Sequence, residues 1–177
     1  QKAVDATKTF ILDCFGVAIA GTLAPGVSEM LGVLGGWGGT GESTVLVSGE
    51  KLPAPSSAMM NSFLMHNQEF DCVHDLAVVH AFTTVLPVAI AVAETQGGVT
   101  GREFLTAVAL GVDVASFIGI SSRSPIAHFR PGTAGAFGAV AAAGKIAGFD
   151  QATLSNAMGI VYSQICGTLQ PHSEGAQ

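Results

Sequence analysis

Three long stretches of this chain are almost free of charged side chains. Residues 76–93, 104–120 and 131–144 contain a single acidic residue, Asp113, and no lysine or arginine. Over all 177 residues the charged share is 11%, less than half of the roughly 25% found in ordinary soluble domains. Because so few charges cannot cover a free-standing globule, the chain either enters a membrane or buries apolar surface against another domain or subunit.

None of the three stretches has the features expected of a membrane-spanning helix, which needs about 20 strongly apolar residues with basic residues biased to one flank. The first is interrupted by His80 and Pro87, the second contains Asp113, and the third is mostly alanine and glycine. The chain also does not open with a basic segment followed by an apolar one, as a signal peptide does. We therefore expect no contact with a membrane.

Composition excludes two other classes of protein. Apolar residues make up 49% of the chain, which excludes intrinsic disorder, and the formal net charge of −6 argues against a nucleic-acid-binding surface. The three cysteines, Cys14, Cys72 and Cys166, are odd in number and far apart, which is not typical of a disulfide framework or a zinc site. We expect a protein of a reducing compartment, the cytoplasm.

Apolar residues recur at helical spacing along most of the chain, which predicts a mainly α-helical structure with no domain boundary between residues 1 and 177. Thr100 and Glu103 have the spacing of a capping box, and Asp150 is a typical N-cap. Only residues 43–48 alternate as a short strand does. The predicted helices cover residues 3–20 and 27–34, a segment from Ser56 or Ser57 to 65, and residues 84–95, 102–120, 133–146 and 151–166.

The densest group of titratable side chains lies between residues 66 and 80. Carboxylates beside imidazoles in an apolar setting have shifted pKa values that suit proton transfer near neutral pH. Two other interpretations stay open: a solvated loop between helices, or a metal site, although the spacing matches no helical ligand motif such as His-Glu-x-x-His. The group consists of the acids Glu69, Asp71 and Asp75 and the histidines His66, His74 and His80.

A second group of polar residues precedes a glycine-rich helix start. Arg123 and Arg130 lie just before the segment 132–138, whose glycines predict either an anion-binding helix N-terminus or simply close helix packing. The pattern is neither a Walker loop nor a dinucleotide fingerprint. After the last predicted helix, His172 and Glu174 lie in a polar segment that carries no functional weight by itself.

These clusters resemble conserved segments of the MmgE/PrpD family. The segment Asn67-Gln-Glu-Phe-Asp71 is similar to the family's His-Ala-x-Asp/Glu-Phe-Asp-Asp. His80-Ala-Phe-Thr-Thr-Val-Leu-Pro87 is similar to its His-Pro-Ser-x-x-Val-Leu-Pro, and Phe129-Arg-Pro-Gly-Thr-Ala-Gly-Ala-Phe-Gly138 to its Phe-His-Pro-Thr-Gly-Thr-x-Gly-x-Phe-Gly. The resemblance extends over nearly the whole chain.

The resemblance implies a large helical domain joined to a smaller α/β lid domain, usually in a homodimer, with the substrate cleft between the two domains. Family chains are more than twice as long as this one. We therefore expect residues 1–177 to form one incomplete, all-helical domain with at most a short β segment, and the C-terminal lid domain to be missing. A missing domain also explains why charged side chains are scarce.

The resemblance also implies roles for individual residues. Glu69 and Asp71 match acids of the family motif, and His80 matches a histidine of the pocket. The chain departs from the family at Val73, where many relatives have threonine, and by one extra residue before His80. It departs again at Arg130, where relatives often have a catalytic histidine. A guanidinium is no base near neutral pH but clamps carboxylates well, so His74 or His172 is expected to take over proton transfer.

We therefore expect a cofactor-independent lyase similar to 2-methylcitrate dehydratase, acting on a small di- or tricarboxylate by removing a proton next to a carboxylate. The candidate catalytic residues are Glu69, Asp71, His74 and His80, and the candidate substrate-binding residues are Arg123, Arg130, Thr133 and His172. No metal ligand is expected among them. The alternatives are an isomerase or epimerase of a dicarboxylate and a catalytically silent helical module for binding or oligomerisation.

Overall fold

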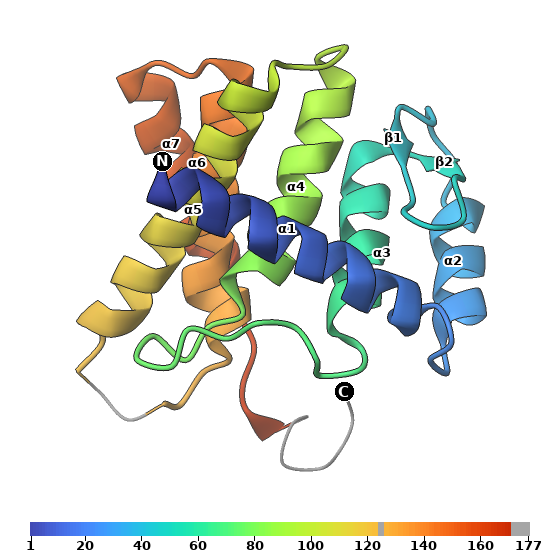
Figure 1. Cartoon of the computed structure of the whole chain (residues 1–177), viewed down its shortest axis with the longest axis horizontal. Coiled ribbons are helices and arrows are strands. Elements are labelled where there is room, and N and C mark those ends of the chain that lie inside the picture. The colour runs from blue at the N-terminus through green and yellow to red at the C-terminus, as the bar shows by residue number, and fades with distance from the viewer. Residues whose placement is uncertain (124–125, 171–177) are drawn as a thin grey trace.

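The computed structural model describes residues 1–123 and 126–170, and within these ranges the chain is mainly α-helical, as the sequence predicts (Figure 1). Its one sheet there is an antiparallel pair, β1 (Ser43–Thr44) and β2 (Lys51–Leu52). The helices are α1 (Lys2–Gly21), α2 (Val27–Gly36), α3 (Ala54–His66), α4 (Ala81–Thr95), α5 (Gly101–Ser121), α6 (Ala136–Ala147) and α7 (Gln151–Gln164), with a π-helical turn, η1 (Pro131–Gly135), leading into α6.

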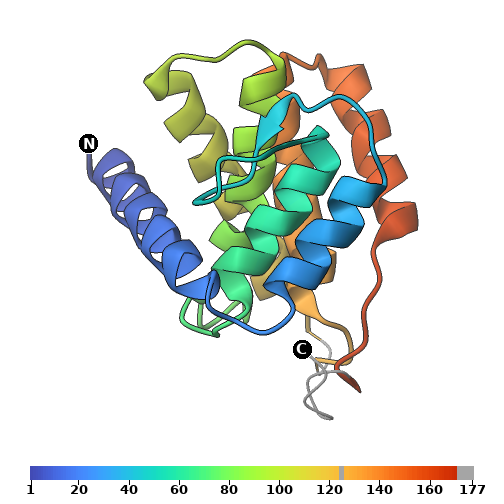
Figure 2. The same cartoon turned by 90° about the vertical axis from the view of Figure 1, so that its right-hand side faces the viewer.

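Helix α4 lies at the centre and packs against α3, α5 and α6. Figure 2 shows α1 along one side of the bundle and α7 along the opposite side. Helix α1 contacts α3, α4 and α5, whereas α7 contacts α6. The main core forms where α3 and α4 meet their neighbours, and its fully buried members include Leu34, Met60, Leu64, Met65, Val85 and Leu86.

Two glycines bring α5 and α6 into close contact. A Cβ atom on Gly138 would lie 2.4 Å from the carbonyl oxygen of Gly111, and one on Gly111 would lie 2.6 Å from the carbonyl oxygen of Gly138. Any side chain at either position would therefore push the two helices apart. For Gly138 this supports the close-packing interpretation of the glycine-rich segment.

Two of the predicted helix caps are confirmed and one is wrong. Thr100 forms the expected capping box with Glu103, and the side chain of Asp150 accepts a hydrogen bond from the Thr153 amide. Helix α3 instead begins at Ala54, before either predicted serine cap. The hydroxyl of Ser57 donates to the Thr44 carbonyl at 2.7 Å, so this serine ties α3 to β1 rather than capping a helix.

Helix α4 begins three residues earlier than predicted, at Ala81 instead of residue 84, which places Pro87 inside the helix. Proline has no amide hydrogen, so the carbonyl of Thr83, four residues earlier, loses its usual helical partner. The hydroxyl of Ser62 on α3 donates to that carbonyl at 2.9 Å. A contact between helices thus replaces the missing bond and joins α3 to the first turn of α4.

Helix α5 corrects the expectation that none of the uncharged stretches has the features of a membrane-spanning helix. With 21 residues and a mean hydropathy of 1.9 over its most apolar window, it is long and apolar enough to cross a membrane. Length and composition alone do not separate such a helix from the core helix of a soluble protein. Here one side of α5 packs against α6, α4 and α1, and a third of that window is buried.

Candidate functional site

The carboxylate of Asp71 is at the centre of a buried polar cluster between the end of α3 and the start of α4. Its side chain is fully buried, and its Oδ1 atom lies 3.0 Å from Nδ1 of His66. Its Oδ2 atom lies 3.0 Å from Nδ1 of His80 and also accepts a hydrogen bond from the Thr83 hydroxyl. We call these four residues the Asp71 cluster.

Local backbone geometry brings the four side chains together. Helix α3 ends at His66, and the side chain of the next residue, Asn67, donates to the Gly21 carbonyl at 3.0 Å, which fixes the exit from α3 against α1. Glu69 then adopts a left-handed conformation with φ of 55°, so the chain turns back and carries Asp71 inward. His80 is the N-cap residue of α4, and Thr83 lies in its first turn.

The electrostatics of the cluster favour a charged carboxylate. Burial by itself raises the pKa of Asp71, but the hydrogen bonds from His66, His80 and Thr83 outweigh it and hold the pKa well below its usual range. The start of α4 contributes in the same direction, because a helix N-terminus favours a nearby anion. The hydrogen bond to Asp71 raises the pKa of His66 in turn, against the opposing effect of burial.

The two imidazoles of the cluster differ in their second nitrogen. Since a carboxylate can only accept, each Nδ1 atom facing Asp71 must carry a hydrogen, which leaves Nε2 as the other functional atom. Nε2 of His66 lies 3.4 Å from the carboxylate of Glu69, so this ring has an acid on both sides. Within the described residues, Nε2 of His80 has no hydrogen-bond partner and is therefore available as a base.

Two hollows meet at His66. One, of about 230 Å³, is lined by His66 and His80 together with Thr84, Phe129 and Gly132. The other, of about 350 Å³, is lined by His66 and Glu69 and by apolar residues of α2 and α3. Sites for drug-sized ligands measure about 300–1,000 Å³, so the hollow beside His80 suits a small molecule.

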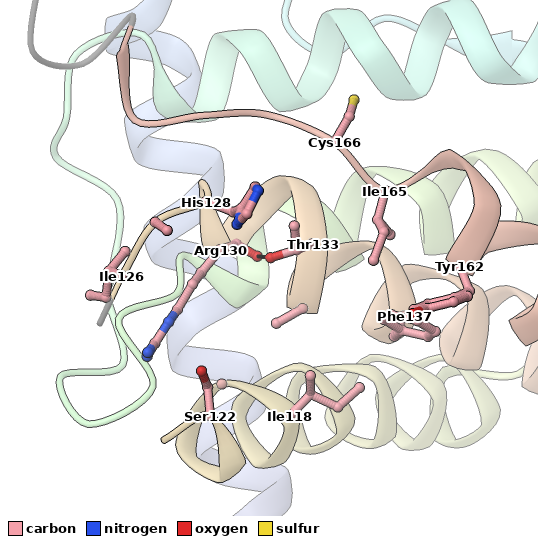
Figure 3. Close-up of a pocket in the computed structure, with 13 residues that line it drawn as sticks. Ile118, Ser122, Ile126, His128, Arg130, Thr133, Phe137, Tyr162, Ile165 and Cys166 are labelled. Atoms are coloured by element: carbon pink, nitrogen blue, oxygen red, sulfur yellow. Dashed lines mark hydrogen bonds between the residues drawn. The ribbon is translucent and has the colours of Figure 1, made fainter. Parts of the chain in front are cut away.

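Arg130 and Thr133 line a different cavity of about 440 Å³, which lies between the ends of α5, α6 and α7 (Figure 3). The guanidinium of Arg130 reaches across one end of this cavity and donates to the Ala77 carbonyl, while Phe137 and Tyr162 lie at the other end. His128 also lines it. We call this the Arg130 cavity.

The candidate residues from the sequence therefore separate into groups. Asp71 and His80 lie together, with Glu69 beside them at His66, whereas Arg130 and Thr133 face the Arg130 cavity. His74 is exposed and accepts a hydrogen bond from the Ala77 amide at 3.2 Å, so the structure does not bring it to Asp71. Arg123 is exposed on the segment after α5, and His172 lies outside the described residues.

Sequence reasoning left two members of the Asp71 cluster out of the candidate site. His66 belongs to the predicted titratable group but is given no role in the predicted site, and Thr83 enters only as part of the motif segment 80–87, just before the helix predicted over 84–95. The sequence offers one signal for Thr83. It lies three residues after His80, so in a helix that begins at His80 the two side chains are close and can contact the same acid. No sequence signal shows that the chain turns back at Glu69.

The same cluster contains ligands of the types that bind transition metals. Nitrogen atoms of His66 and His80 and an oxygen atom of Asp71 lie within 4.8 Å of one another. Two imidazoles and one carboxylate are typical ligands of zinc or iron. Because both Nδ1 atoms point at Asp71, an ion bound through these atoms would have to displace the two hydrogen bonds.

Comparison with known proteins identifies similar chains. The family model of the MmgE/PrpD N-terminal domain matches residues 1–177. The chain is 26% identical over 187 residues to cis-aconitate decarboxylase of Aspergillus terreus, covering 99% of this chain and 37% of the relative. A cis-aconitate decarboxylase-like protein of Aspergillus oryzae is 24% identical over 178 residues, covering 95% of this chain and 37% of the relative. The chain thus spans little more than a third of the length of these relatives.

Proposed function

Because the chain belongs to the MmgE/PrpD family, we propose that it forms the helical part of a lyase that acts on a small di- or tricarboxylate. The observation that carries the proposal is the pairing of His80 with buried Asp71, which leaves Nε2 of the imidazole without a hydrogen-bond partner among the described residues, beside a small hollow. In this proposal, Nε2 of His80 removes a proton from the carbon next to a substrate carboxylate.

Asp71 has two effects on His80 in this step. Its hydrogen bond fixes the tautomer with the hydrogen on Nδ1, so that Nε2 carries the lone pair. When His80 takes up the proton, the carboxylate stabilises the imidazolium that forms, as the orienting acid does in other base–acid pairs. Asp71 itself stays ionised, in keeping with its low pKa.

His66 has a complementary role. Its position between Asp71 and Glu69 favours the protonated form, and its ring lies close to that of His80, with centroids 4.8 Å apart in an edge-on arrangement. A protonated imidazole at this place stabilises the negative charge that develops when the substrate loses its proton. Proton removal therefore falls to His80 and charge stabilisation to His66.

Arg130 supplies the positive charge that a polycarboxylate needs. The segment 129–133 is a wall between two hollows: Phe129, Pro131 and Gly132 face the one beside His80, and Arg130 and Thr133 face the Arg130 cavity. A guanidinium can clamp a carboxylate through two hydrogen bonds. We propose that Arg130 binds a substrate carboxylate from its own side of this segment, and that the lid domain and a second subunit complete the site around His80.

The reaction after proton removal has two candidate forms. Loss of water, as in a dehydratase, is the reaction that the sequence analysis expects. The printed names of the relatives, cis-aconitate decarboxylases at 24–26% identity, favour loss of carbon dioxide. Loss of water needs a base that removes the proton next to a carboxylate, whereas loss of carbon dioxide leaves an electron pair on carbon that must take up a proton; in this proposal His80 is the base in the first case and, once protonated, the proton donor in the second.

Proton exchange tests the proposal. The intact natural protein is incubated in D2O with cis-aconitate, citrate and methylcitrate, and the substrates are followed by NMR. We expect deuterium at the carbon next to a carboxylate together with loss of water or carbon dioxide. The variant His80→Gln should slow exchange by about 10²–10⁴-fold, whereas His74→Gln, which changes an exposed histidine nearby, should leave the rate unchanged.

Two results would contradict the proposal. Exchange without net product would instead favour an isomerase or epimerase. No exchange with any of the acids, from a protein that is folded by circular dichroism, would favour a silent helical module.

A further inference from the structure

A hollow of about 350 Å³ lies on one face of α3, and the proposed reaction makes no use of it. Four of its lining residues occupy positions i, i+3, i+4 and i+7 of that helix, which places them on the same side: Met59, Ser62, Phe63 and His66. Met30 lines it from the neighbouring helix α2 (Figure 2). We call this the methionine hollow.

The methionine hollow adjoins the hollow beside His80. Ser62 and His66 line both of them. These two residues are four positions apart on α3, so their side chains are neighbours on the helix surface. A ligand whose reacting carbon lies near His80 can therefore extend a branch past His66 into the methionine hollow.

The polar side chains of the methionine hollow already have partners within the described residues. The Ser62 hydroxyl donates to a backbone carbonyl of α4, and the Asn67 amide donates to the last carbonyl of α1. The two nitrogens of His66 face Asp71 and Glu69. What remains for a ligand is the surface of two methionines and a phenylalanine, and methionine adapts its shape to irregular apolar groups.

The charge of the methionine hollow argues against a carboxylate as its occupant. A carboxylate there would face that of Glu69, and none of the described residues that line the hollow is a lysine or an arginine. Like charges at such short range repel each other. An apolar group meets no such repulsion and gains free energy when it leaves water.

The size of the hollow limits the apolar group to a short chain. An apolar cavity of about 150 Å³ holds one benzene molecule, so about 350 Å³ has room for a butyl group. We propose that the methionine hollow binds an apolar branch of the substrate, which is then an alkyl-substituted di- or tricarboxylate. This inference rests on the proposed function, because it places the reacting carbon at His80.

Turnover of matched substrates tests the inference. The intact natural protein is given citrate, methylcitrate and butylcitrate in separate assays. We expect kcat/KM to rise by about fourfold for each methylene added up to butyl, because each one is buried. Met59→Glu, which puts a charge at the half-exposed rim, should lower kcat/KM for butylcitrate about tenfold more than for citrate. Ile160→Glu, on the exposed side of α7, is the control and should change neither.

NMR of methionine methyl groups measures binding without turnover. The intact natural protein, labelled with ¹³C at these methyl groups, is titrated with butylsuccinate and with succinate, and Met→Leu variants assign the signals. We expect butylsuccinate to shift the signals of Met30 and Met59, and succinate to shift neither. Met158 on α7 lies outside the hollow and should not move in either titration.

The two measurements distinguish failure of the inference from failure of the proposed function. Turnover of citrate with a kcat/KM that falls as the alkyl group lengthens would overturn the inference and leave the proposed lyase standing. Butylsuccinate that leaves Met30 and Met59 unmoved would overturn it as well. If no acid is turned over but butylsuccinate still shifts these two signals, the lyase proposal fails and the apolar binding site is supported.

Discussion

The Asp71 cluster and the Arg130 cavity are neighbours in the structure but are built in opposite ways. In the cluster, the central carboxylate is fully buried and three side chains donate to it. In the cavity, the guanidinium of Arg130 donates to the backbone carbonyl of Ala77 and borders about 440 Å³ of open space. One region is internally complete, whereas the other has hydrogen-bonding groups left over for a ligand.

Because of this difference, the Asp71 cluster suits the positioning of a side chain, and the Arg130 cavity suits the binding of a ligand. The hydrogen bonds of the cluster hold His80 in one orientation before any substrate arrives, which is what a base needs. A guanidinium has five donors, and within the part of the chain that the structure describes Arg130 uses one of its nitrogens on the Ala77 carbonyl, which leaves other donors for a ligand carboxylate. We therefore expect changes in the cluster to alter stability and rate, and changes in the cavity to alter affinity.

Replacing the central carboxylate should have the largest effect. Asp71→Asn removes the buried charge and leaves His66 and His80 without their ionic partner, which should lower the free energy of unfolding by about 3 kcal/mol. Urea denaturation followed by circular dichroism measures this change. Asp75→Asn, which changes an exposed acid four residues later, is the matched control and should stay within about 0.5 kcal/mol of wild type. Equal losses of unfolding free energy in Asp71→Asn and Asp75→Asn would contradict the stabilising role of the Asp71 cluster.

Replacing Arg130 should have a smaller effect, and on a different quantity. Arg130→Gln removes the clamp but keeps a polar side chain beside Ala77, so KM for the substrate should rise about tenfold with kcat nearly unchanged. Steady-state kinetics of the intact natural protein with cis-aconitate measures both constants. Arg102→Gln, an exposed arginine at the start of α5, serves as the control. A loss confined to kcat would place Arg130 in the chemical step instead.

The pH dependence of stability gives a finer test of the cluster. The raised pKa of His66 means that the folded chain holds its proton more tightly than the unfolded chain, in which the pKa is about 6.5. The stabilisation is therefore complete below about pH 6.5 and is lost as the pH rises through the raised value in the folded state. The difference in unfolding free energy between wild type and His66→Gln should shrink over that range. A difference that grows with pH would contradict the assignment.

Asp71 should show the opposite dependence. Its lowered pKa means that stability is present above the unfolded value of about 3.9 and is lost as the pH falls below it. Comparison of wild type with Asp71→Asn isolates this term. In the variant, the loss of stability between about pH 4 and pH 2 should be weaker. An unchanged acid limb would show that Asp71 does not hold its charge in the folded state.

Metal removal should have the smallest effect. If hydrogen bonds alone satisfy Asp71, prolonged treatment with a chelator should leave Tm unchanged, and added Zn²⁺ should not raise it. Thermal melting with and without the metal measures this directly. A rise in Tm with Zn²⁺ that is absent from His66→Gln would show that the cluster binds the ion, since ligands that bind only the folded state stabilise it.

Much of the fold follows from local signals in the sequence. The capping box at Thr100, the Asp150 cap and the helical spacing of apolar residues correctly predict helices close to their observed bounds. Local signals fail where a distant contact replaces a local one. Helix α4 begins three residues before its predicted start, because the hydrogen bond from Ser62 to the Thr83 carbonyl compensates for Pro87, and no local pattern reveals that partner.

The candidate site shows the same limit. Composition and motif resemblance led to Asp71 and His80, because few charges exist in this chain and several of them gather there. The sequence could not show that His74 points away while His66 points inward, since the left-handed turn at Glu69 decides which histidine faces the acid. Nor could the sequence show that Arg130 and Thr133 face a different hollow from the one beside His80. Residues 131–135 form a π-helical turn, and no sequence pattern indicates which side chains of such a turn point to the same side.

The central claim is that Asp71 holds His80 with its hydrogen on Nδ1 and its lone pair on Nε2. Long-range ¹H–¹⁵N correlation spectra of the uniformly labelled chain, recorded at about pH 8 where a free histidine is neutral, distinguish the two tautomers directly. We predict that His80 shows a protonated Nδ1 and an unprotonated Nε2, and that Asp71→Asn abolishes this preference. A His80 ring protonated on Nε2 in the wild-type chain would contradict the claim and remove the proposed base.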